Sequence, residues 1–328
     1  MSACRCVVIT EPGDESVLRI VEREPRDPGP GDVVVRVRAA GLNRADLLQR
    51  QGHYPAPRGV PSDIPGLEVA GEIEAVGEEV DAWSVGDRVM AIVAGGGMSE
   101  LTVVPQGQLM SIPGSISFPS AAAIPEAFLT AFDAIAMQGA AREGENLLVH
   151  AAASGVGTAA LQLGHLMGMR PLATTRTEAK SHRLVEYGAD EVIVVSDRKF
   201  ADRVREMTGS GADVILDFVG GAYLEENLRS LATGGRIVAI GLLGGARAEI
   251  SLGRLLAKRA TLVGTVLRSR SKGEKAALVA SFQGRFAAAW GSKELCPVIH
   301  EVMPVEKVGE AHRLLASNET FGKIVLTF

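Results

Sequence analysis

The sequence predicts an α/β protein of two domains, one mainly β and one built on a doubly wound parallel sheet. Three observations support this prediction. Residues 1–120 contain short apolar runs separated by Gly and Pro, whereas residues 121–269 alternate such runs with long Ala- and Leu-rich segments. A small-residue turn at 151–157 follows a strand-like run and leads into a helix-like one. The length of 328 residues is enough for two domains of ordinary size.

The first region reads as a compact β unit. Its strand-like runs are closely spaced: CVVIT, DVVVRVRAAG, VAGEIEAVG, DRVMAIV and ELTVVP. Residues 43–52 fit a short helix after a strand. The closing run GKIVLTF has the same texture as the N-terminal region. We therefore expect a first domain of residues 1–120, completed by about 270–328.

The second region, residues 121–269, reads as repeated βαβ units. Its strand-like runs are NLLVHAA, PLATTRT, DEVIVVS, ADVILDFVG, GRIVAIG and ATLVGTVL. Strands that alternate with helices favour a parallel sheet covered on both faces. Two later segments, 274–290 and 304–317, also fit helices.

Composition argues against several classes of protein. The chain has 34 Lys and Arg against 39 Asp and Glu, a net charge of -5 without long runs of either sign, so a nucleic-acid partner is not expected. Cys4, Cys6 and Cys296 are too few and too badly spaced for a disulfide framework or a four-ligand zinc site. The N-terminal apolar run is too short for a signal peptide. No apolar run approaches the ~20 residues of a membrane helix. We expect a soluble, cytoplasmic protein.

The turn at 151–157 is the first candidate binding element. After a strand, Ser154, Gly155, Val156 and Gly157 lead straight into a helix. Such a turn lets the backbone and the helix N-terminus approach a pyrophosphate, and close packing of the helix on the strand requires a small residue at Gly157 or Ala160. The alternative is a tight turn without a ligand. The strands that follow favour dinucleotide binding.

The end of the next strand predicts which dinucleotide binds. NAD-binding units place an acidic residue there, but this chain has Thr175, Arg176, Thr177 and Lys180. Hydroxyls and fixed positive charges suit a 2′-phosphate, which favours NADPH. Alternatively, Arg176 and Lys180 are ordinary solvated helix charges.

At this point the sequence resembles a known family. The motifs GLNRADLLQRQGHYP, IPGLEVAGEIEAVG, GDRVMAIVAGGGMSE, AAAIPEAFLTAFDAI and HAAASGVGTAALQL resemble those of medium-chain dehydrogenase/reductases. They are most similar to the zinc-free quinone oxidoreductase branch that includes zeta-crystallin, and within it to the stress-inducible quinone reductases. The resemblance implies a GroES-like β domain and a Rossmann domain, with NADPH and substrate in the cleft between them. Zinc members have Cys and His where this sequence has Asn43 and Leu67, so no metal is expected.

The resemblance also implies site residues. Asn43, Asp46 and Tyr54 would be catalytic: the Asn43 amide can donate a hydrogen bond to nicotinamide or substrate, and the Tyr54 hydroxyl can donate to a developing oxyanion. Each has an alternative. Asn43 could simply cap the helix that follows, Asp46 could be a structural hydrogen-bond acceptor, and Tyr54 could be a loop residue that packs on the surface.

Further positions match family residues that line the cofactor pocket: Gly241, Leu242, Leu267, Arg268, Ser269 and Lys323. The alternatives are an ordinary strand-end turn at GLLGG and a solvent-exposed strand lysine at 323. One departure concerns the third strand, where relatives carry a Tyr near the 2′-phosphate and this chain has Val195.

The expected activity is NADPH-dependent reduction of quinones, especially small ortho-quinones, by direct hydride transfer without metal or flavin. One alternative is a conjugate reductase of enones, alkenals or enoyl thioesters. Another, of a different class, is a non-catalytic NADPH-binding structural or sensor protein. The resemblance also implies a homodimer, in which the run ATLVGTVL could pair across a two-fold axis.

Overall fold

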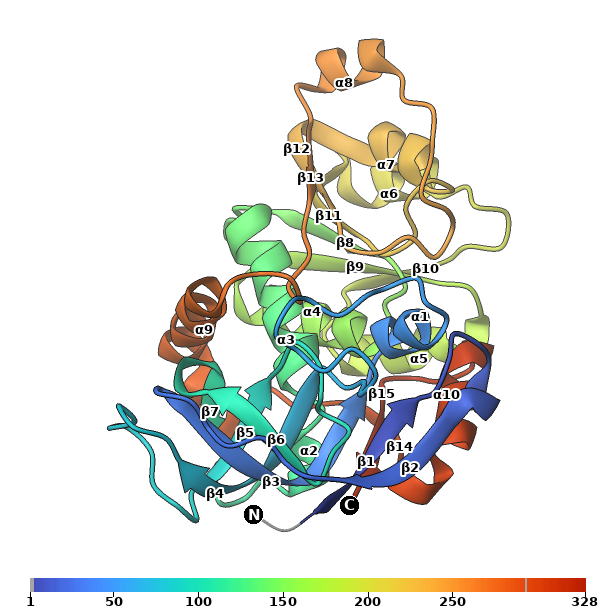
Figure 1. Ribbon diagram of the computed structural model, residues 1–328. Helices are drawn as coiled ribbons and strands as arrows, with labels where there is room; N and C mark the ends of the chain where they lie inside the picture. The colour runs from blue at the N-terminus through green and yellow to red at the C-terminus, as the bar shows by residue number, and fades with distance from the viewer. Residues whose placement is uncertain (1–2, 293) are drawn as a thin grey trace. The chain divides into compact units, whose positions relative to one another are not determined.

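The computed structural model describes residues 3–292 and 294–328. They divide into two compact units (Figure 1). Unit 1 comprises the described residues of Met1–Leu129 and Leu267–Phe328, and unit 2 comprises Thr130–Val266.

Unit 1 is built on β-sheets. Its strands are β1 (Cys4–Ile9), β2 (Leu18–Arg23), β3 (Asp32–Leu42), β4 (Glu68–Val76), β5 (Arg88–Ile92), β6 (Leu101–Pro105), β7 (Leu109–Ser111), β14 (Ile299–Pro304) and β15 (Lys323–Thr327). β1 and β2 pair with each other. The others form a sheet in the order β14-β15-β3-β4-β5-β7, and β6 also pairs with β3. All its pairings are antiparallel except β14 with β15.

Alternating side chains explain why these segments form strands. Val33, Val35 and Val37 of β3 point into one buried cluster together with Val69 and Ile73 of β4. A period of two places every second residue on the same face of a strand. The sheet thereby removes a continuous row of β-branched side chains from water.

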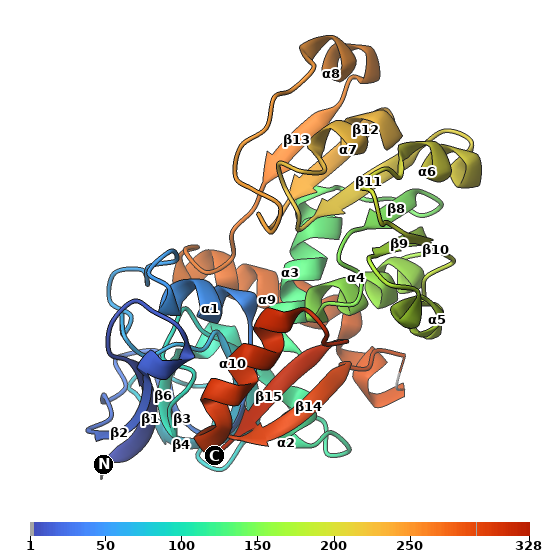
Figure 2. The same ribbon diagram turned by 90° about the vertical axis from the view of Figure 1, so that its right-hand side faces the viewer.

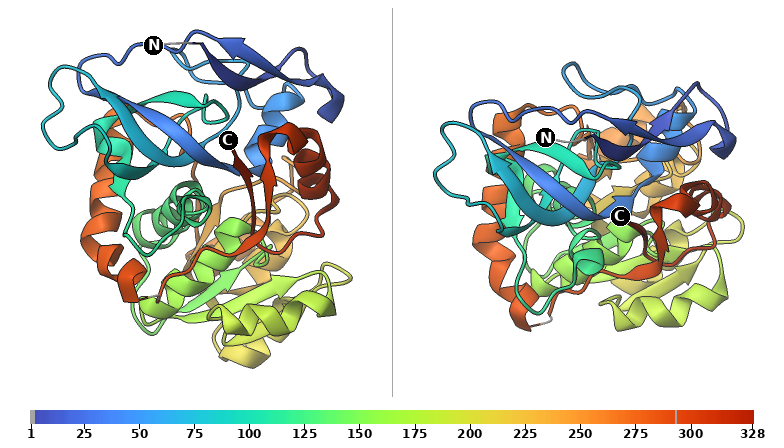
Figure 3. Two further views of the ribbon diagram at one scale, coloured as in Figure 1. Left: turned by 90° about the horizontal axis from the view of Figure 1, so that it is seen from below. Right: turned by 60° about the horizontal axis from the view of Figure 1, so that its bottom comes forward.

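The last strand lies beside one of the first. β15 pairs antiparallel with β3, with Ile324 opposite Leu42 and Leu326 opposite Ala40 (Figure 3). This pairing brings Lys323 to the end of β3, directly next to Asn43 in the following turn. Residues 280 positions apart in the chain thus meet at one edge of the sheet.

Helices complete unit 1, and α9 is the longest of them with 21 residues. They are η1 (Glu15–Val17), α1 (Arg44–Arg50), η2 (Gln106–Gln108), α2 (Phe118–Ala121), α9 (Lys272–Ser292), η4 (Val305–Lys307) and α10 (Val308–Ser317). Helix α3 (Pro125–Phe132) begins in unit 1 and ends in unit 2, where the π-helical turn η3 (Asp133–Gln138) follows it.

One segment corrects the expectation about apolar runs. Phe118–Gln138, a stretch of 21 residues, is long and apolar enough to cross a membrane by length and composition. However, 78% of its most apolar window is buried within the protein, as is usual for a core helix. It is the one such segment among the described residues.

Unit 2 is a parallel sheet with helices on both faces. Its strands are β8 (Asn146–Val149), β9 (Arg170–Thr175), β10 (Glu191–Val194), β11 (Ala212–Asp217), β12 (Leu231–Ala239) and β13 (Thr261–Gly264). Its helices are α4 (Gly155–Leu166), α5 (Glu178–Glu186), α6 (Ala201–Thr208), α7 (Leu224–Ser230) and α8 (Leu252–Lys258). Figure 2 shows α4 and α5 on one side of the sheet and α6 and α7 on the other.

The strand order of unit 2 is that of a doubly wound Rossmann fold. Every pairing in β10-β9-β8-β11-β12-β13 is parallel. The order therefore corresponds to 3-2-1-4-5-6, in which ligands bind at the carboxyl ends of the strands, where the order reverses. The predicted fold class is confirmed.

Candidate functional site

The small-residue turn leads into the capped N-terminus of helix α4. Ser154 is the N-cap of α4, and its Oγ accepts a hydrogen bond from the Gly157 N–H at 3.0 Å. The N–H groups of Gly155 and Val156, in the first turn of the helix, have no intrahelical partner. These donors and the helix dipole suit a phosphate group. The Ser154 oxygen acts as a cap, a role that the sequence analysis did not assign to it.

Gly157 lets this helix lie close to the turn. A Cβ at Gly157 would lie 2.6 Å from the Ala151 oxygen and 2.6 Å from the Ala152 Cα. Both neighbours are backbone atoms, so they cannot move aside cheaply. Of the two small residues expected to allow close packing, Gly157 is the one that meets neighbouring backbone at this distance.

Positive charge gathers at the carboxyl ends of β9 and β10. Thr175 is buried at the end of β9, and Arg176 and Thr177 follow it on the surface. Burial raises the pKa of the Tyr223 hydroxyl, while the positive charges of Arg176 and Arg198 lower it. Both guanidinium groups therefore lie within electrostatic range of Tyr223. Neither forms an ion pair or a hydrogen bond in the described part of the chain.

Sequence reasoning missed Arg198. The signal was available, because SDRK follows the third strand of the Rossmann unit just as TTRT follows the second. Lys180 lies in the first turn of α5, half-buried. Val195 is a core residue at 4% exposure, and its N–H donates to the Thr175 oxygen at 2.8 Å.

A buried hydrogen-bond chain connects the strand ends of unit 2. His150 is 2.9 Å from Thr174 Oγ1 through Nδ1 and 2.7 Å from Asn227 Oδ1 through Nε2. Asn227 donates to Asp217 at 3.0 Å, and the other Asp217 oxygen accepts from the Val219 and Gly220 N–H groups. Burial lowers the pKa of His150. A neutral His150 that donates from Nε2 and accepts at Nδ1 gives every polar side chain of this hydrogen-bond network a partner.

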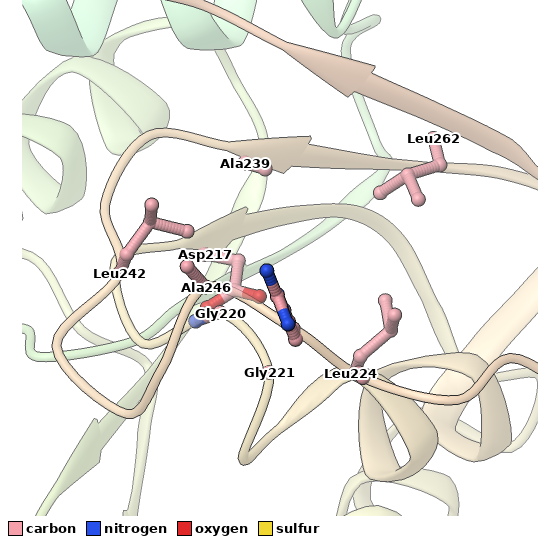
Figure 4. Close-up of a pocket in the computed structure, with 10 residues that line it drawn as sticks. Asp217, Gly220, Gly221, Leu224, Ala239, Leu242, Ala246 and Leu262 are labelled. Atoms are coloured by element: carbon pink, nitrogen blue, oxygen red, sulfur yellow. Dashed lines mark hydrogen bonds between the residues drawn. The ribbon is translucent and has the colours of Figure 1, made fainter.

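A small pocket lies beside Asp217. Its volume is about 140 Å³, and Figure 4 shows Asp217, Gly220 and Leu242 among the residues that line it. This volume is too small for a whole dinucleotide. Leu242 is exposed, and Gly241 is fixed by an N–H donated to the Asp217 oxygen at 3.2 Å. A Cβ at Gly241 would lie 2.9 Å from the Phe218 oxygen.

In unit 1, Asp46 organises the start of α1. One of its oxygens accepts from the Asn43 N–H at 2.8 Å and the other from the Gly66 N–H at 2.9 Å. The side chain is fully buried, and burial raises its pKa to about 6. Both oxygens are thus occupied by backbone. We interpret Asp46 as a positioning residue, which is the structural alternative of the sequence analysis.

Asn43 belongs to a buried ionic network. Its Nδ2 donates to Glu68 Oε1 at 3.0 Å, and its Oδ1 accepts from Lys323 Nζ at 2.6 Å. Lys323 also donates to the Leu42 oxygen at 2.9 Å and lies 2.5 Å from Glu68. The three Nζ donors are therefore all used within unit 1. We interpret Lys323 as a structural cation, and the alternative of a solvent-exposed lysine is wrong because Lys323 is 5% exposed.

Glu68 is the centre of this network, and sequence reasoning missed it. It is fully buried, and its second oxygen accepts from the Glu126 N–H at 2.9 Å. A charged residue inside the apolar run LEVAG was the available signal. Removing a carboxylate from water is costly unless it is paired, which Lys323 achieves here.

Arg268 holds the loop that carries Tyr54. Its Nε donates to the Ala94 oxygen at 2.7 Å, Nη1 to the Tyr54 oxygen at 3.0 Å and Nη2 to Gln49 Oε1 at 2.6 Å. The guanidinium carbon lies 4.9 Å from the centre of the Tyr54 ring, a cation–π distance. Leu267 is buried and Ser269 is exposed. Arg268, predicted to bind cofactor, thus spends its donors on unit 1.

The donor set does not fit a zinc ion. The family resemblance implies that Asn43 and Leu67 stand where zinc-binding members have ligands. Within residues 3–292 and 294–328, no three His, Cys, Asp or Glu side chains come together to hold a metal. We therefore derive no step through a metal.

Comparisons with known proteins agree with this geometry. Residues 29–114 match the alcohol dehydrogenase GroES-like domain, and residues 155–282 match the family described as zinc-binding dehydrogenase. The chain is 33% identical over 327 residues to a quinone oxidoreductase of Lama guanicoe, covering 98% of this chain and 97% of that protein. It belongs to the medium-chain dehydrogenase/reductase superfamily.

Several solved structures are similar to this chain over nearly its whole length. A quinone oxidoreductase of Pseudomonas syringae pv. tomato superposes with a TM-score of 0.89 at 32% identity, covering 99% of this chain and 100% of that one. A mycobacterial protein complexed with NADPH gives 0.88 at 31% identity, covering 99% and 100%. The CurK enoyl reductase gives 0.87 at 27% identity, covering 99% of both.

Proposed function

We propose that this chain is an NADPH-dependent quinone reductase that acts on small ortho-quinones by direct hydride transfer, without metal or flavin. The observation that supports NADPH as the cofactor is the pair of arginines at the carboxyl edge of the Rossmann sheet. Among the described residues, Arg176 and Arg198 have no carboxylate partner. The acceptor class is supported by the 33% identity to a quinone oxidoreductase.

Each part of unit 2 has a role in this proposal. The helix start at Gly155 and Val156 would hold the pyrophosphate, and Arg176 and Arg198 would hold the 2′-phosphate through charge-assisted hydrogen bonds. The chain of His150, Asn227 and Asp217 keeps the strand ends fixed. Bound NADPH supplies the hydride, so the protein contributes position and electrostatics.

A conjugate reductase is the second candidate. The likeness to an enoyl reductase at a TM-score of 0.87 favours it, because the same fold serves both reactions. Quinones and α,β-unsaturated carbonyls both delocalise the charge that a hydride brings. Only a direct comparison of acceptors separates the two reactions.

The test is a turnover comparison. Purified protein with NADPH is mixed with 1,2-naphthoquinone or with a 2-alkenal, and oxidation of NADPH is followed by absorbance. We expect turnover of the quinone with the higher kcat/KM. Turnover of the alkenal alone would favour the conjugate reductase. Binding of NADPH without turnover of either acceptor would favour a structural or sensor protein.

We also propose a homodimer formed through strand β13. β13 is an edge strand of the Rossmann sheet, and Leu262 on it is 44% exposed. An apolar edge strand is a surface that a second copy can cover by continuing the sheet. Size-exclusion chromatography with light scattering should give twice the mass of one chain, and Leu262→Arg should shift it to one chain.

A further inference from the structure

We propose that Tyr223 is a specificity residue for NADPH: its hydroxyl group donates a hydrogen bond to the 2′-phosphate, beside Arg176 and Arg198. This inference rests on the proposed function, because it takes NADPH as the cofactor, and it adds a residue that separates NADPH from NADH. Every residue that it uses lies in unit 2. It therefore concerns the adenosine half of the cofactor alone.

The ring of Tyr223 is fixed in the core of unit 2. Tyr223 is 8% exposed and belongs to the buried cluster that also contains Leu148 and Val195. Its ring centre lies 4.9 Å from that of His150 and 5.0 Å from that of Phe200, at interplanar angles of 76° and 52°. Edge-to-face contacts of this kind are favourable, so the ring has little freedom to turn.

Both aromatic neighbours connect the tyrosine ring to the carboxyl ends of β9 and β10. His150 Nδ1 is 2.9 Å from the hydroxyl of Thr174, which lies two residues before Arg176. Phe200 follows Arg198 by two residues in the segment after β10. The ring thus contacts the surroundings of both arginines. These contacts place it on the adenosine side of the Rossmann sheet, where the end of the second strand meets the ribose of a dinucleotide.

The hydroxyl group of Tyr223 has no partner. Within residues 3–292 and 294–328 it forms no hydrogen bond, and it is not among the fully buried polar atoms that lack one. The oxygen therefore opens to solvent, although the side chain as a whole is more than nine-tenths buried. A buried tyrosine usually finds a hydrogen-bond partner for its hydroxyl. A bound ligand would supply the partner that the described residues do not.

The surroundings of this hydroxyl suit a phosphate group. Arg176 and Arg198 are exposed, and neither has a carboxylate partner in the described part of the chain. Burial raises the pKa of Tyr223, and the two positive charges oppose this rise, in agreement with the ring contacts. Arg198 has a left-handed backbone with φ of 64°, which is uncommon for a residue with a side chain and recurs at ligand sites.

Two acids in the same region do not cancel this positive charge. Asp217 raises the pKa of Tyr223, but its two oxygens already accept three hydrogen bonds, two of them from backbone. Asp197 is followed by two cations, Arg198 and Lys199, and one of its oxygens accepts the Lys199 N–H at 3.1 Å. The segment after β10 therefore keeps an excess of positive charge for an incoming anion.

The chemistry of the contact explains why it would discriminate. NADPH differs from NADH by the 2′-phosphate alone. A hydrogen bond to a charged oxygen is roughly twice as strong as one between neutral groups. A phenol keeps its proton at neutral pH, so it is available as a donor. Loss of this donor should therefore weaken NADPH and leave NADH almost unchanged.

The test compares Tyr223→Phe with a matched control, Tyr187→Phe. Phenylalanine keeps the ring contacts with His150 and Phe200 and removes only the hydroxyl. Tyr187 is the C-cap of α5, at the opposite end of that helix from Arg176. The ligands are adenosine 2′,5′-bisphosphate and 5′-AMP, which differ by the 2′-phosphate and need only the adenosine site.

Calorimetry gives the Kd of each ligand. Tyr223→Phe should weaken binding of the bisphosphate roughly tenfold and leave 5′-AMP within about twofold. Tyr187→Phe should match the wild type for both ligands. Unchanged affinity for the bisphosphate in Tyr223→Phe would overturn this inference. An equal loss for 5′-AMP would show that the hydroxyl only supports the fold, and it would overturn the inference as well.

A second readout follows the tyrosine itself. The ultraviolet absorbance of ionised tyrosine reports its pKa, and a bound phosphate dianion should raise the pKa of one tyrosine. This rise should be absent in Tyr223→Phe and present in Tyr187→Phe. A wild type that binds both ligands equally well would overturn the 2′-phosphate site of the proposed function and this inference with it. If both readouts are as expected but quinone is not reduced, the proposed reaction is wrong and this inference stands.

Discussion

Removing the ammonium group of Lys323 should destabilise the protein strongly. The perturbation is Lys323→Met, which keeps most of the side-chain length but leaves Glu68 without its countercharge. Glu68 is fully buried, Lys323 is 5% exposed, and the two charged groups lie 2.5 Å apart. Breaking such a pair from one side costs roughly 3 to 5 kcal/mol, because an uncompensated charge remains buried.

The matched comparison is a double-mutant cycle that adds Glu68→Gln and the double variant Lys323→Met with Glu68→Gln. The double variant buries neither of the two charges, so it should recover most of the stability lost in Lys323→Met. Urea unfolding of the wild type, both single variants and the double variant measures the coupling free energy. A loss below about 1 kcal/mol for Lys323→Met, without coupling to Glu68, would refute the buried pair. If the double variant is stable but binds NADPH far more weakly, Lys323 contacts the cofactor after all.

Three further predictions concern the cofactor and the carboxyl group of Glu126. Arg176→Ala and Arg198→Ala should each weaken NADPH binding by roughly 1 to 3 kcal/mol and spare NADH, as measured by calorimetry; equal losses for both cofactors would contradict the 2′-phosphate site. Gly157→Ala should weaken both cofactors at least roughly tenfold and lower Tm, because its Cβ meets backbone 2.6 Å away; unchanged Tm and Kd would show that the turn has room. The folded-state pKa of Glu126 is raised, so its proton stabilises the fold at low pH and that stability is lost as pH rises towards about 8. Glu126→Gln should therefore gain Tm relative to wild type between about pH 5 and 8, and a constant difference across this range would contradict the raised pKa.

Most of the fold could be predicted from local patterns. Alternating Val and Ile residues identified β3 and β4, and the strand–turn–helix sequence at 146–166 identified the start of the Rossmann unit. β2 and β14 were missed. Their sequences, LRIVER and IHEVMP, mix charged and apolar residues. β2 is stabilised by pairing with β1 and β14 by pairing with β15, which the local sequence does not show.

The candidate site was only partly predictable. The family resemblance identified Asn43 and Asp46, and the position after the second strand of the Rossmann unit identified Arg176. Their partners depend on tertiary contacts: Lys323 reaches Asn43 across 280 residues. Glu126 lies within the motif AAAIPEAFLTAFDAI, but its sequence position does not show that its N–H donates to Glu68.

We propose above that this protein transfers hydride directly from NADPH to an ortho-quinone. The most direct measurement is a single turnover by stopped flow, with protein, 1,2-naphthoquinone and NADPH that carries deuterium or hydrogen at the transferred C4 position. We predict that NADPH oxidation requires the protein and slows with deuterium, without any flavin absorbance. Oxidation of NADPH that depends on the protein but proceeds at the same rate with both isotopes would contradict direct hydride transfer. A rate of oxidation that is no higher with the protein than without it would also contradict it.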